Sequence, residues 1–286
     1  MFAFTTSDRF KLLDEKDRDR LEALSKLDEF KAGEEILVSG HTGEWLYLIA
    51  SGEVDIKAKG MTLAQLGPGD IFGELETFAD LPAESIKHVA RVDTIVRAIN
   101  KHPLKQEMKT HRSLASGLLA VFCRSISEKV RAANDVAIKL GQAPVSVPPG
   151  RPAHLNEEEA AWLSLLGQKL SADAGEIVVK EGDTSRSFYV IEKGDMEVRK
   201  QAATGERTLA TLGTRDMFGF MAFVDGKPRS ASVVAVKPCD LTKIEPDMLE
   251  KATHLNFTVS FKFLGTLCGV LGRTYRDTAT SILARA

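Results

Sequence analysis

The sequence has little cysteine, no excess of either charge and no long uninterrupted hydrophobic run. Its three cysteines, Cys123, Cys239 and Cys268, are odd in number and far apart, which disfavours a disulfide framework or a zinc site and predicts buried free thiols. The 38 basic and 40 acidic residues give a formal net charge of -2, which provides no general attraction to nucleic acid or an anionic membrane. Composition therefore excludes function classes without selecting one.

Signals for a membrane or for export are also weak. The N-terminus turns polar before a secretory apolar core could form, which predicts a cytoplasmic protein. The most apolar stretch, residues 255–272, is interrupted by Lys262 and barely reaches spanning length, so we expect a buried or partner-facing helix there.

Motifs of catalysis are missing as well. The six histidines form no His-x-His pair, which disfavours a metal-dependent enzyme and predicts no metal site. No Gly-x-Ser-x-Gly elbow, Walker loop or kinase signature occurs, so we predict that the chain is not an enzyme.

The chain is instead organised by an internal repeat. Gly52 and Gly194 lie 142 residues apart, and the same offset relates Gly33 to Gly175. In both copies short β-rich runs alternate with glycine turns, and there is no room between them for crossover helices. The predicted fold is mainly β with flanking α-helices: two antiparallel β-barrel or jelly-roll domains, each followed by an amphipathic helix.

Apolar periodicity places the two helices. Within roughly residues 104–140 and again within 257–282, apolar residues recur at steps of three and four, typical of an amphipathic helix. Four of the ten prolines, at 144, 148, 149 and 152, mark a stiff linker between the copies, and Asn156 with Glu159 resembles a capping box. We predict a first domain at 1–141, a linker at 142–153 and a second domain at 154–286. The first helical seam consists of Leu119, Phe122, Ile126, Val130, Ala133, Ala137 and Leu140, and the second of Phe257, Phe261, Leu264, Cys268, Leu271, Tyr275, Thr278 and Ile282.

Two loops carry the functional signal. Residues 71–90, IFGELETFADLPAESIKHVA, form what we call the first cassette, and residues 217–235, MFGFMAFVDGKPRSASVVA, form the second cassette. With their flanking strands and helices they resemble the cyclic nucleotide-binding domain of CRP-type regulators and of the regulatory subunit of cAMP-dependent protein kinase. The resemblance implies that each cassette is a phosphate-binding loop, in which backbone N–H groups and an arginine receive the cyclic phosphate and a glutamate accepts the ribose hydroxyl.

The second cassette keeps the phosphate half of this chemistry. Gly219 opens the loop, Arg229 stands at the arginine position, and Ser230 and Ala231 offer further donors. Phe220 replaces the ribose-binding glutamate, and a phenyl ring cannot accept a hydroxyl hydrogen bond, so a cyclic nucleotide would bind at least about tenfold more weakly or another anion would be preferred.

The first cassette shows the opposite loss. Phe72, Gly73 and Glu74 match the family pattern, but Ala83 or Glu84 occupies the arginine position, depending on the register, and Ser85 follows. A ligand without a phosphate, such as a nucleoside, would suit this loop better than a cyclic nucleotide.

Two functions stay open on this evidence. One is a non-enzymatic signalling protein that senses a cyclic nucleotide such as cAMP or cGMP, or a related small ligand, through the second cassette and relays binding through the adjacent helices. The other is a ligand-independent interaction adaptor on degenerate barrels. No other cofactor is predicted. A protein partner of unknown identity is expected. For the chain itself, both a monomer and a homodimer stay open.

Two partner classes are disfavoured by what the sequence does not contain. Too few residues follow Pro246 for a helix-turn-helix, and the region holds no obvious recognition helix, so no nucleic-acid partner is predicted. No pseudosubstrate motif of the type Arg-Arg-x-Ala/Ser precedes the first barrel, so a kinase partner is not predicted either.

Overall fold

A computed structural model of the chain describes residues 2–38, 44–78, 86–140, 161, 164–202, 205–248, 251 and 257–284. The chain divides into two compact units, Met1–Gln142 with Tyr275–Ala286, and Ala143–Thr274. The predicted domain limits of 1–141 and 154–286 place the last twelve residues differently. The C-terminal end of the last helix lies with the first unit, because it packs there in space although it follows the second barrel in sequence.

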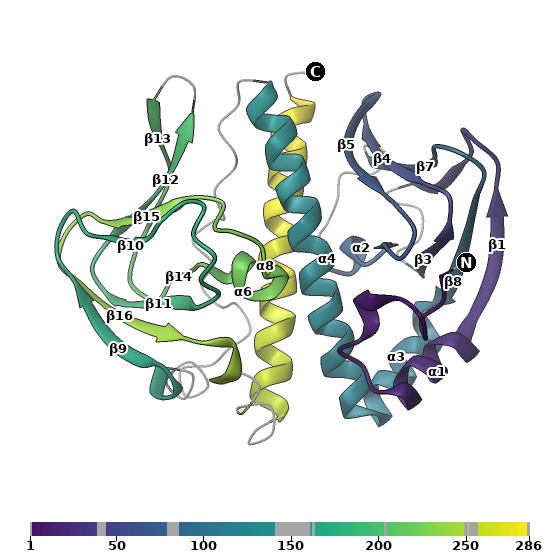
Figure 1. Cartoon of the computed structure of the whole chain (residues 1–286), viewed down its shortest axis with the longest axis horizontal. Coiled ribbons are helices and arrows are strands. Elements are labelled where there is room, and N and C mark those ends of the chain that lie inside the picture. The colour runs from purple at the N-terminus through teal and green to yellow at the C-terminus, as the bar shows by residue number, and fades with distance from the viewer. Residues whose placement is uncertain are drawn as a thin grey trace. The chain divides into compact units, whose positions relative to one another are not determined.

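Among its described residues, the first unit contains eight strands in two four-stranded antiparallel sheets, ordered β1-β8-β3-β6 and β2-β7-β4-β5 (Figure 1). Glycine turns separate short strands whose inward residues are apolar, so the sheets close on each other as a jelly roll. The strands are β1 Ser25–Phe30, β2 Glu35–Val38, β3 Trp45–Ser51, β4 Val54–Ala58, β5 Met61–Leu66, β6 Ile71–Phe72, β7 Ile86–Ala90 and β8 Thr94–Asn100.

The second unit repeats this topology strand for strand, with sheets ordered β9-β16-β11-β14 and β10-β15-β12-β13. This confirms the predicted fold class of mainly antiparallel β domains with flanking helices. The strands are β9 Gln168–Ala172, β10 Ile177–Val179, β11 Phe188–Lys193, β12 Met196–Ala202, β13 Gly205–Leu212, β14 Met217–Phe218, β15 Ser232–Ala235 and β16 Cys239–Ile244.

The helices flank the barrels. Asp14 caps α1 (Glu15–Leu24), its carboxylate accepting a hydrogen bond from the N–H of Asp17 at 2.8 Å. A short helix follows each two-residue strand β6 and β14, inside the cassettes. The helices are η1 Asp8–Phe10, α1 Glu15–Leu24, α2 Leu75–Phe78, α3 Lys101–Thr110, α4 Arg112–Lys139, α6 Phe220–Asp225 and α8 Phe257–Leu283.

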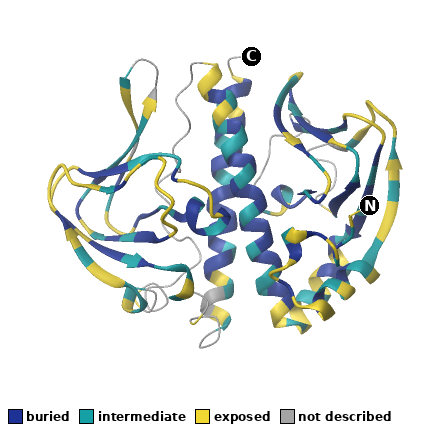
Figure 2. Ribbon diagram, in the orientation of Figure 1, coloured by how far each residue is buried: buried dark blue, intermediate teal, exposed yellow. Residues whose placement is uncertain are grey.

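The helix predicted at 104–140 is two helices, α3 and α4, because the chain takes an extended conformation at His111. Its predicted seam is buried from Leu119 to Ala137, but Leu140 is 49% exposed because it lies just beyond the last turn of α4. Figure 2 shows buried residues along most of α4. The predicted linker and the capping box at Asn156 and Glu159 lie outside the described residues.

The second predicted seam forms α8, in which Leu264, Cys268, Leu271, Tyr275 and Ile282 are buried. All three cysteines are free and buried, as the sequence predicted. Within the described ranges, no helix is long and apolar enough to cross a membrane.

Candidate ligand site

The two cassettes begin with the same construction. In the first, the rings of Tyr47 and Phe72 stack with centroids 4.7 Å apart; in the second, Tyr189 and Phe218 stack at 4.8 Å. A glycine with positive φ follows in each, Gly73 at 93° and Gly219 at 83°. Glycine adopts this backbone conformation without strain, and in both cassettes the chain turns at this residue into a short helix. The cassettes diverge at the next residue, which is Glu74 in one and Phe220 in the other.

The second cassette lines a pocket together with the strands of the β10-β15-β12-β13 sheet. All five residues that the sequence selected there, from Gly219 to Ala231, are in its wall. The other lining residues are apolar. The wall consists of Val179, Val198, Leu212, Met217, Phe218, Gly219, Phe220, Met221, Ala222, Arg229, Ser230, Ala231 and Val233.

Arg229 is the charged group of this wall, and only 4% of its surface is exposed. Its Nη1 donates to the carbonyl of Gly219 at 2.8 Å, and its Nη2 donates to the carbonyl of Ser187 at 2.6 Å and to Ser185 Oγ at 3.1 Å. These acceptors hold the guanidinium in place, and its charge also acts on Asp183, whose pKa is lowered first by hydrogen bonds from Ser185 and further by Arg229. A buried guanidinium fixed in this way is a suitable partner for an oxyanion.

The second cassette is connected to α8 through aromatic rings. Phe223 of α6 meets Phe188 edge to face at 4.7 Å, and Phe188 stacks on Phe263 of α8 at 5.2 Å. Phe188 and Phe263 are fully buried and Phe223 is 6% exposed. Because close-packed rings transmit displacement, a shift of α6 would be felt by α8.

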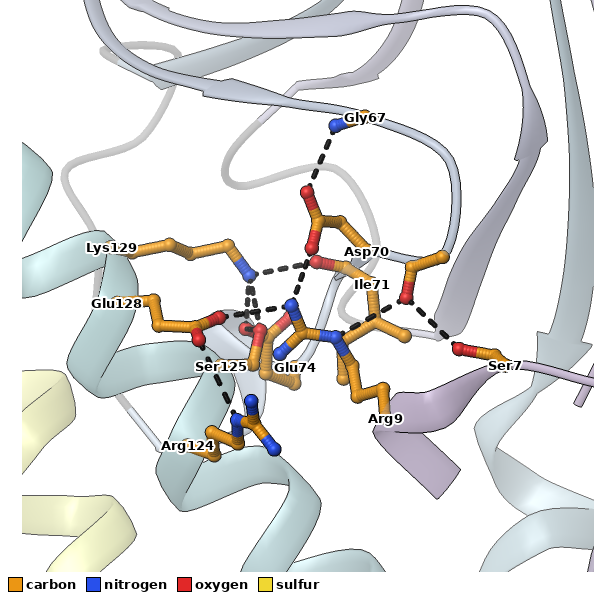
Figure 3. Close-up of polar contacts among 11 residues, drawn as sticks. Ser7, Arg9, Gly67, Asp70, Ile71, Glu74, Arg124, Ser125, Glu128 and Lys129 are labelled. Atoms are coloured by element: carbon orange, nitrogen blue, oxygen red, sulfur yellow. Dashed lines mark hydrogen bonds and ion pairs between the residues drawn. The ribbon is translucent and has the colours of Figure 1, made fainter. Parts of the chain in front are cut away.

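In the first cassette, Glu74 turns to α4 (Figure 3). Its fully buried carboxylate forms an ion pair with Lys129 Nζ, and Ser125 Oγ donates to Glu74 Oε1 at 2.9 Å. Lys129 Nζ also donates to the carbonyl of Ile71 at 2.8 Å, which ties the lysine to the barrel. The glutamate that the resemblance assigned to a ribose hydroxyl is thus already engaged by a helix.

A second polar bridge lies beside this one (Figure 3). Arg9 forms ion pairs with Asp70, in the turn before β6, and with Glu128 of α4 at 2.9 Å. Arg9 also donates from Nε to the carbonyl of Gly69 at 3.2 Å. The N-terminal segment therefore joins the turn just before the first cassette to the same helix that holds Glu74.

Glu76 and Lys101 add further buried charge to the first cassette. Burial raises the pKa of Glu76 above its ordinary value, although Lys101 opposes this shift. Burial likewise lowers the pKa of Lys101, whose Nζ donates to the carbonyl of Gly73. Tyr275 of α8 is fully buried near these carboxylates, and its burial together with the charges of Glu76 and Glu74 raises its pKa. The first cassette is thus surrounded by charges supplied by its own unit.

The other site residues predicted in the first cassette either pack in the interior or lie outside the described residues. Phe72 is fully buried between the rings of Tyr47 and His88. Gly73 lies against strand β3, where a Cβ would come within 2.3 Å of the carbonyl oxygen of Trp45. Ser85, with both candidates for the arginine position, lies outside the described residues.

Sequence reasoning missed the groups that orient the site residues. Lys129 is 55 residues from Glu74, and Ser187 is 42 residues from Arg229, so no local spacing links them. A lysine on the apolar side of a helix was the one available signal, since Lys129 shares that side with Phe122 and Ile126. No group of three or more potential metal ligands occurs among the described residues.

Two jelly rolls that each place a glycine-led loop and a short helix after the corresponding two-residue strand define a tandem repeat of one type of domain. The family model for the cyclic nucleotide-binding domain matches residues 27–111 and 169–254, once in each unit. The chain therefore belongs to the cyclic nucleotide-binding domain family.

Several curated proteins are similar to it. A cAMP-dependent protein kinase regulatory subunit of Debaryomyces hansenii is 29% identical over 221 residues, covering 76% of this chain and 42% of the relative. Another, from Yarrowia lipolytica, is 27% identical over 218 residues, covering 74% of this chain and 50% of the relative. The chain thus spans about half the length of the curated relatives it matches.

Among solved structures, a cyclic nucleotide-binding domain from Methylobacillus flagellatus is 26% identical, with a TM-score of 0.43, over 52% of this chain and 86% of that one.

Proposed function

We propose that the chain is a non-enzymatic signalling protein in which the second repeat binds a small anionic ligand and relays binding through α8. The observation that carries this proposal is Arg229, a buried guanidinium held by two backbone carbonyls and by Ser185 in the wall of a pocket. Membership of the cyclic nucleotide-binding domain family and similarity to kinase regulatory subunits support a regulatory role.

The first repeat, on this proposal, is a structural module. Glu74 is bound to Lys129 and Ser125, so a ligand hydroxyl would have to compete with a buried ion pair for the same carboxylate. Breaking such a pair is costly because it leaves an uncompensated buried charge. The first cassette is therefore poorly suited to release Glu74 to a nucleotide or a nucleoside.

The relay would run through the rings of Phe223, Phe188 and Phe263. An anion at Arg229 would also contact the loop around Gly219, where α6 begins, because the carbonyl of Gly219 is bonded to the same guanidinium. A ligand shifts a conformational equilibrium only through different contacts in the two states. A change in the position of α6 against α8 on binding would supply such a difference, and a protein partner that binds α8 would detect it.

Thermal unfolding with and without ligand tests the proposal. We would measure the midpoint with cAMP, cGMP, adenosine, phenyl phosphate and benzoate, because a ligand at a hundred times its Kd stabilises by about 2.7 kcal/mol, which moves the midpoint by several degrees. At least one of the anions should raise the midpoint. Arg229→Lys, which keeps the charge but not the two-pronged guanidinium, should reduce that rise, and Arg229→Ala should abolish it.

The matched control is Arg207→Ala, in which an exposed arginine of the same repeat is removed. It should leave the ligand-induced rise unchanged. If no ligand raises the midpoint, or if the rise survives in Arg229→Ala, the sensor proposal is wrong and a ligand-independent adaptor becomes the better reading of the fold.

A further inference from the structure

We infer that the second site takes a small oxyanion with an apolar body, such as an aromatic phosphate ester or an aromatic carboxylate, in preference to a cyclic nucleotide. This inference rests on the proposed function and narrows its ligand. It comes from the wall of the pocket, in which one cation stands among apolar side chains.

The lining residues show which groups a ligand would meet. Of the thirteen, Arg229 is charged and Ser230 carries a hydroxyl, whereas Val179, Val198 and Leu212 from the facing strands are apolar. No carboxylate or amide side chain occurs among these lining residues, within the part of the chain that the structure describes. A ligand with one anionic end and a hydrocarbon body fits this distribution, because its charge pairs with Arg229 and its body leaves water.

Phe220 decides the preference. It is the first residue of α6, follows directly on the glycine whose carbonyl Arg229 holds at 2.8 Å, and is 3% exposed. Phe220 and Arg229 therefore both line the same pocket. A ribose hydroxyl brought to this place would lose its hydrogen bonds to water without gaining an acceptor, which weakens binding by about tenfold to a hundredfold. An aromatic or branched hydrocarbon in the same position would lose no hydrogen bond, because it makes none in water.

The first cassette provides the internal reference. Counted from the glycine that ends the stacked aromatic pair, Glu74 and Phe220 occupy the same place. The backbone at this place therefore accepts a carboxylate in one repeat and a ring in the other. Exchanging the residue in the second repeat should change which ligand is bound without changing the fold.

Isothermal titration of the full chain with phenyl phosphate, benzoate and cAMP tests the inference. The native protein should bind phenyl phosphate or benzoate at least about tenfold more tightly than cAMP, and comparison of the first two shows whether phosphate or carboxylate is preferred. Phe220→Glu should reverse the order, binding cAMP at least tenfold more tightly than the native chain does and the apolar anions more weakly. Phe220→Leu, the matched control, should keep the native order.

Phe220→Gln provides an acceptor without a buried charge and should move the order in the same direction if Phe220→Glu does not fold. Native binding of cAMP that equals or exceeds that of the apolar anions would overturn the inference but leave the anion-sensing proposal standing. If both Phe220→Glu and Phe220→Gln keep the native order of ligand affinities, the inference is likewise overturned and the anion-sensing proposal stands. Failure of every anion to bind, or binding unaffected by Arg229→Lys, would instead overturn the proposed function itself.

Discussion

The two repeats share a backbone and differ in where each cassette directs its chemistry. In both, a stacked pair of rings and a glycine with positive φ lead into a short helix. In the first, the next side chain, Glu74, is bound by Lys129 of α4, whereas in the second, Phe220 lines a pocket beside Arg229. One fold thus supports a buried ion pair between cassette and helix in one repeat and a mainly apolar pocket wall in the other.

The contact between cassette and helix differs in kind as well. Ion pairs join the first cassette to α4, through Lys129 and through Arg9 with Glu128. Packed rings join the second cassette to α8, through Phe188 and Phe263. Separating a buried ion pair is expensive because it leaves an uncompensated charge, whereas apolar packing is non-directional, so rings can repack in a second arrangement. The comparison therefore predicts a rigid first repeat and an adjustable second one.

The largest loss of stability should come from breaking the buried ion pair between Glu74 and Lys129 in the first repeat. Lys129→Met leaves the fully buried carboxylate of Glu74 without its cation, which should lower the free energy of unfolding by about 3–5 kcal/mol. Urea unfolding followed by circular dichroism measures the loss. The double variant Glu74→Gln with Lys129→Met removes both charges and should recover most of it.

The matched control lies in the second repeat, where Lys169 pairs with Glu192 at 2.9 Å on the surface. Lys169→Met should cost no more than about 1 kcal/mol, because water screens an exposed pair. Equal losses in the free energy of unfolding for Lys129→Met and Lys169→Met would contradict a larger contribution from the buried ion pair of the first repeat.

An intermediate effect should separate the two cassette glycines. A Cβ at Gly73 would lie 2.3 Å from the carbonyl oxygen of Trp45, whereas at Gly219 its closest neighbour, at 2.8 Å, is the side-chain Nη1 of Arg229. Backbone cannot move aside as a side chain can, so Gly73→Ala should cost about 2–4 kcal/mol in total, more than Gly219→Ala. Gly219→Ala should instead displace the guanidinium and weaken anion binding.

Gly33→Ala isolates the cost of positive φ alone, since Gly33 has φ of 88° and open space around it. Its loss should be about 1–2 kcal/mol. Urea unfolding gives the three stabilities, and titration with phenyl phosphate gives the binding. A loss in Gly73→Ala no greater than in Gly33→Ala would show that the contact with Trp45 is easily relieved.

The smallest effect should appear in the pH dependence of stability. Burial raises the pKa of Glu76 above 4.5, so the folded chain holds this proton more tightly than the unfolded chain does. Its contribution is present below the unfolded pKa and is lost as pH rises through the folded pKa. Glu76→Gln should therefore stabilise the protein at pH 7 and flatten the decline in stability as the pH rises through the folded pKa of Glu76.

Glu192 of the second repeat should make stability depend on pH in the opposite direction. Burial alone would raise the pKa of Glu192, but hydrogen bonds from Thr242 and Lys169 lower it overall. Its contribution is therefore present above the unfolded pKa and is lost as pH falls through the folded value. Glu192→Gln should destabilise at pH 7 and approach the native stability at low pH. Urea unfolding from pH 4 to pH 8 measures both variants, and slopes of the same sign would refute the contrast.

Local patterns foretold much of the fold because they depend on neighbours in sequence. The offset between Gly52 and Gly194 predicted the repeated barrel, and the spacing of apolar residues from Leu119 to Ala137 predicted the long helix. The break at His111 was missed because the same apolar period continues on either side of it. Gly219, Phe220, Arg229, Ser230 and Ala231 line one pocket, and their predicted role as ligand contacts stays a prediction.

The sequence by itself determined the repeated β-rich units, the free cysteines and the exchange of Glu74 for Phe220, since each follows from residue type and spacing. Only the tertiary structure decided that Glu74 meets Lys129, that Arg229 is fixed by Ser187, and that the end of α8 joins the first unit. The physical reason is distance along the chain. Ion pairs and hydrogen bonds between residues tens of positions apart depend on how whole elements pack, and no local pattern records that packing.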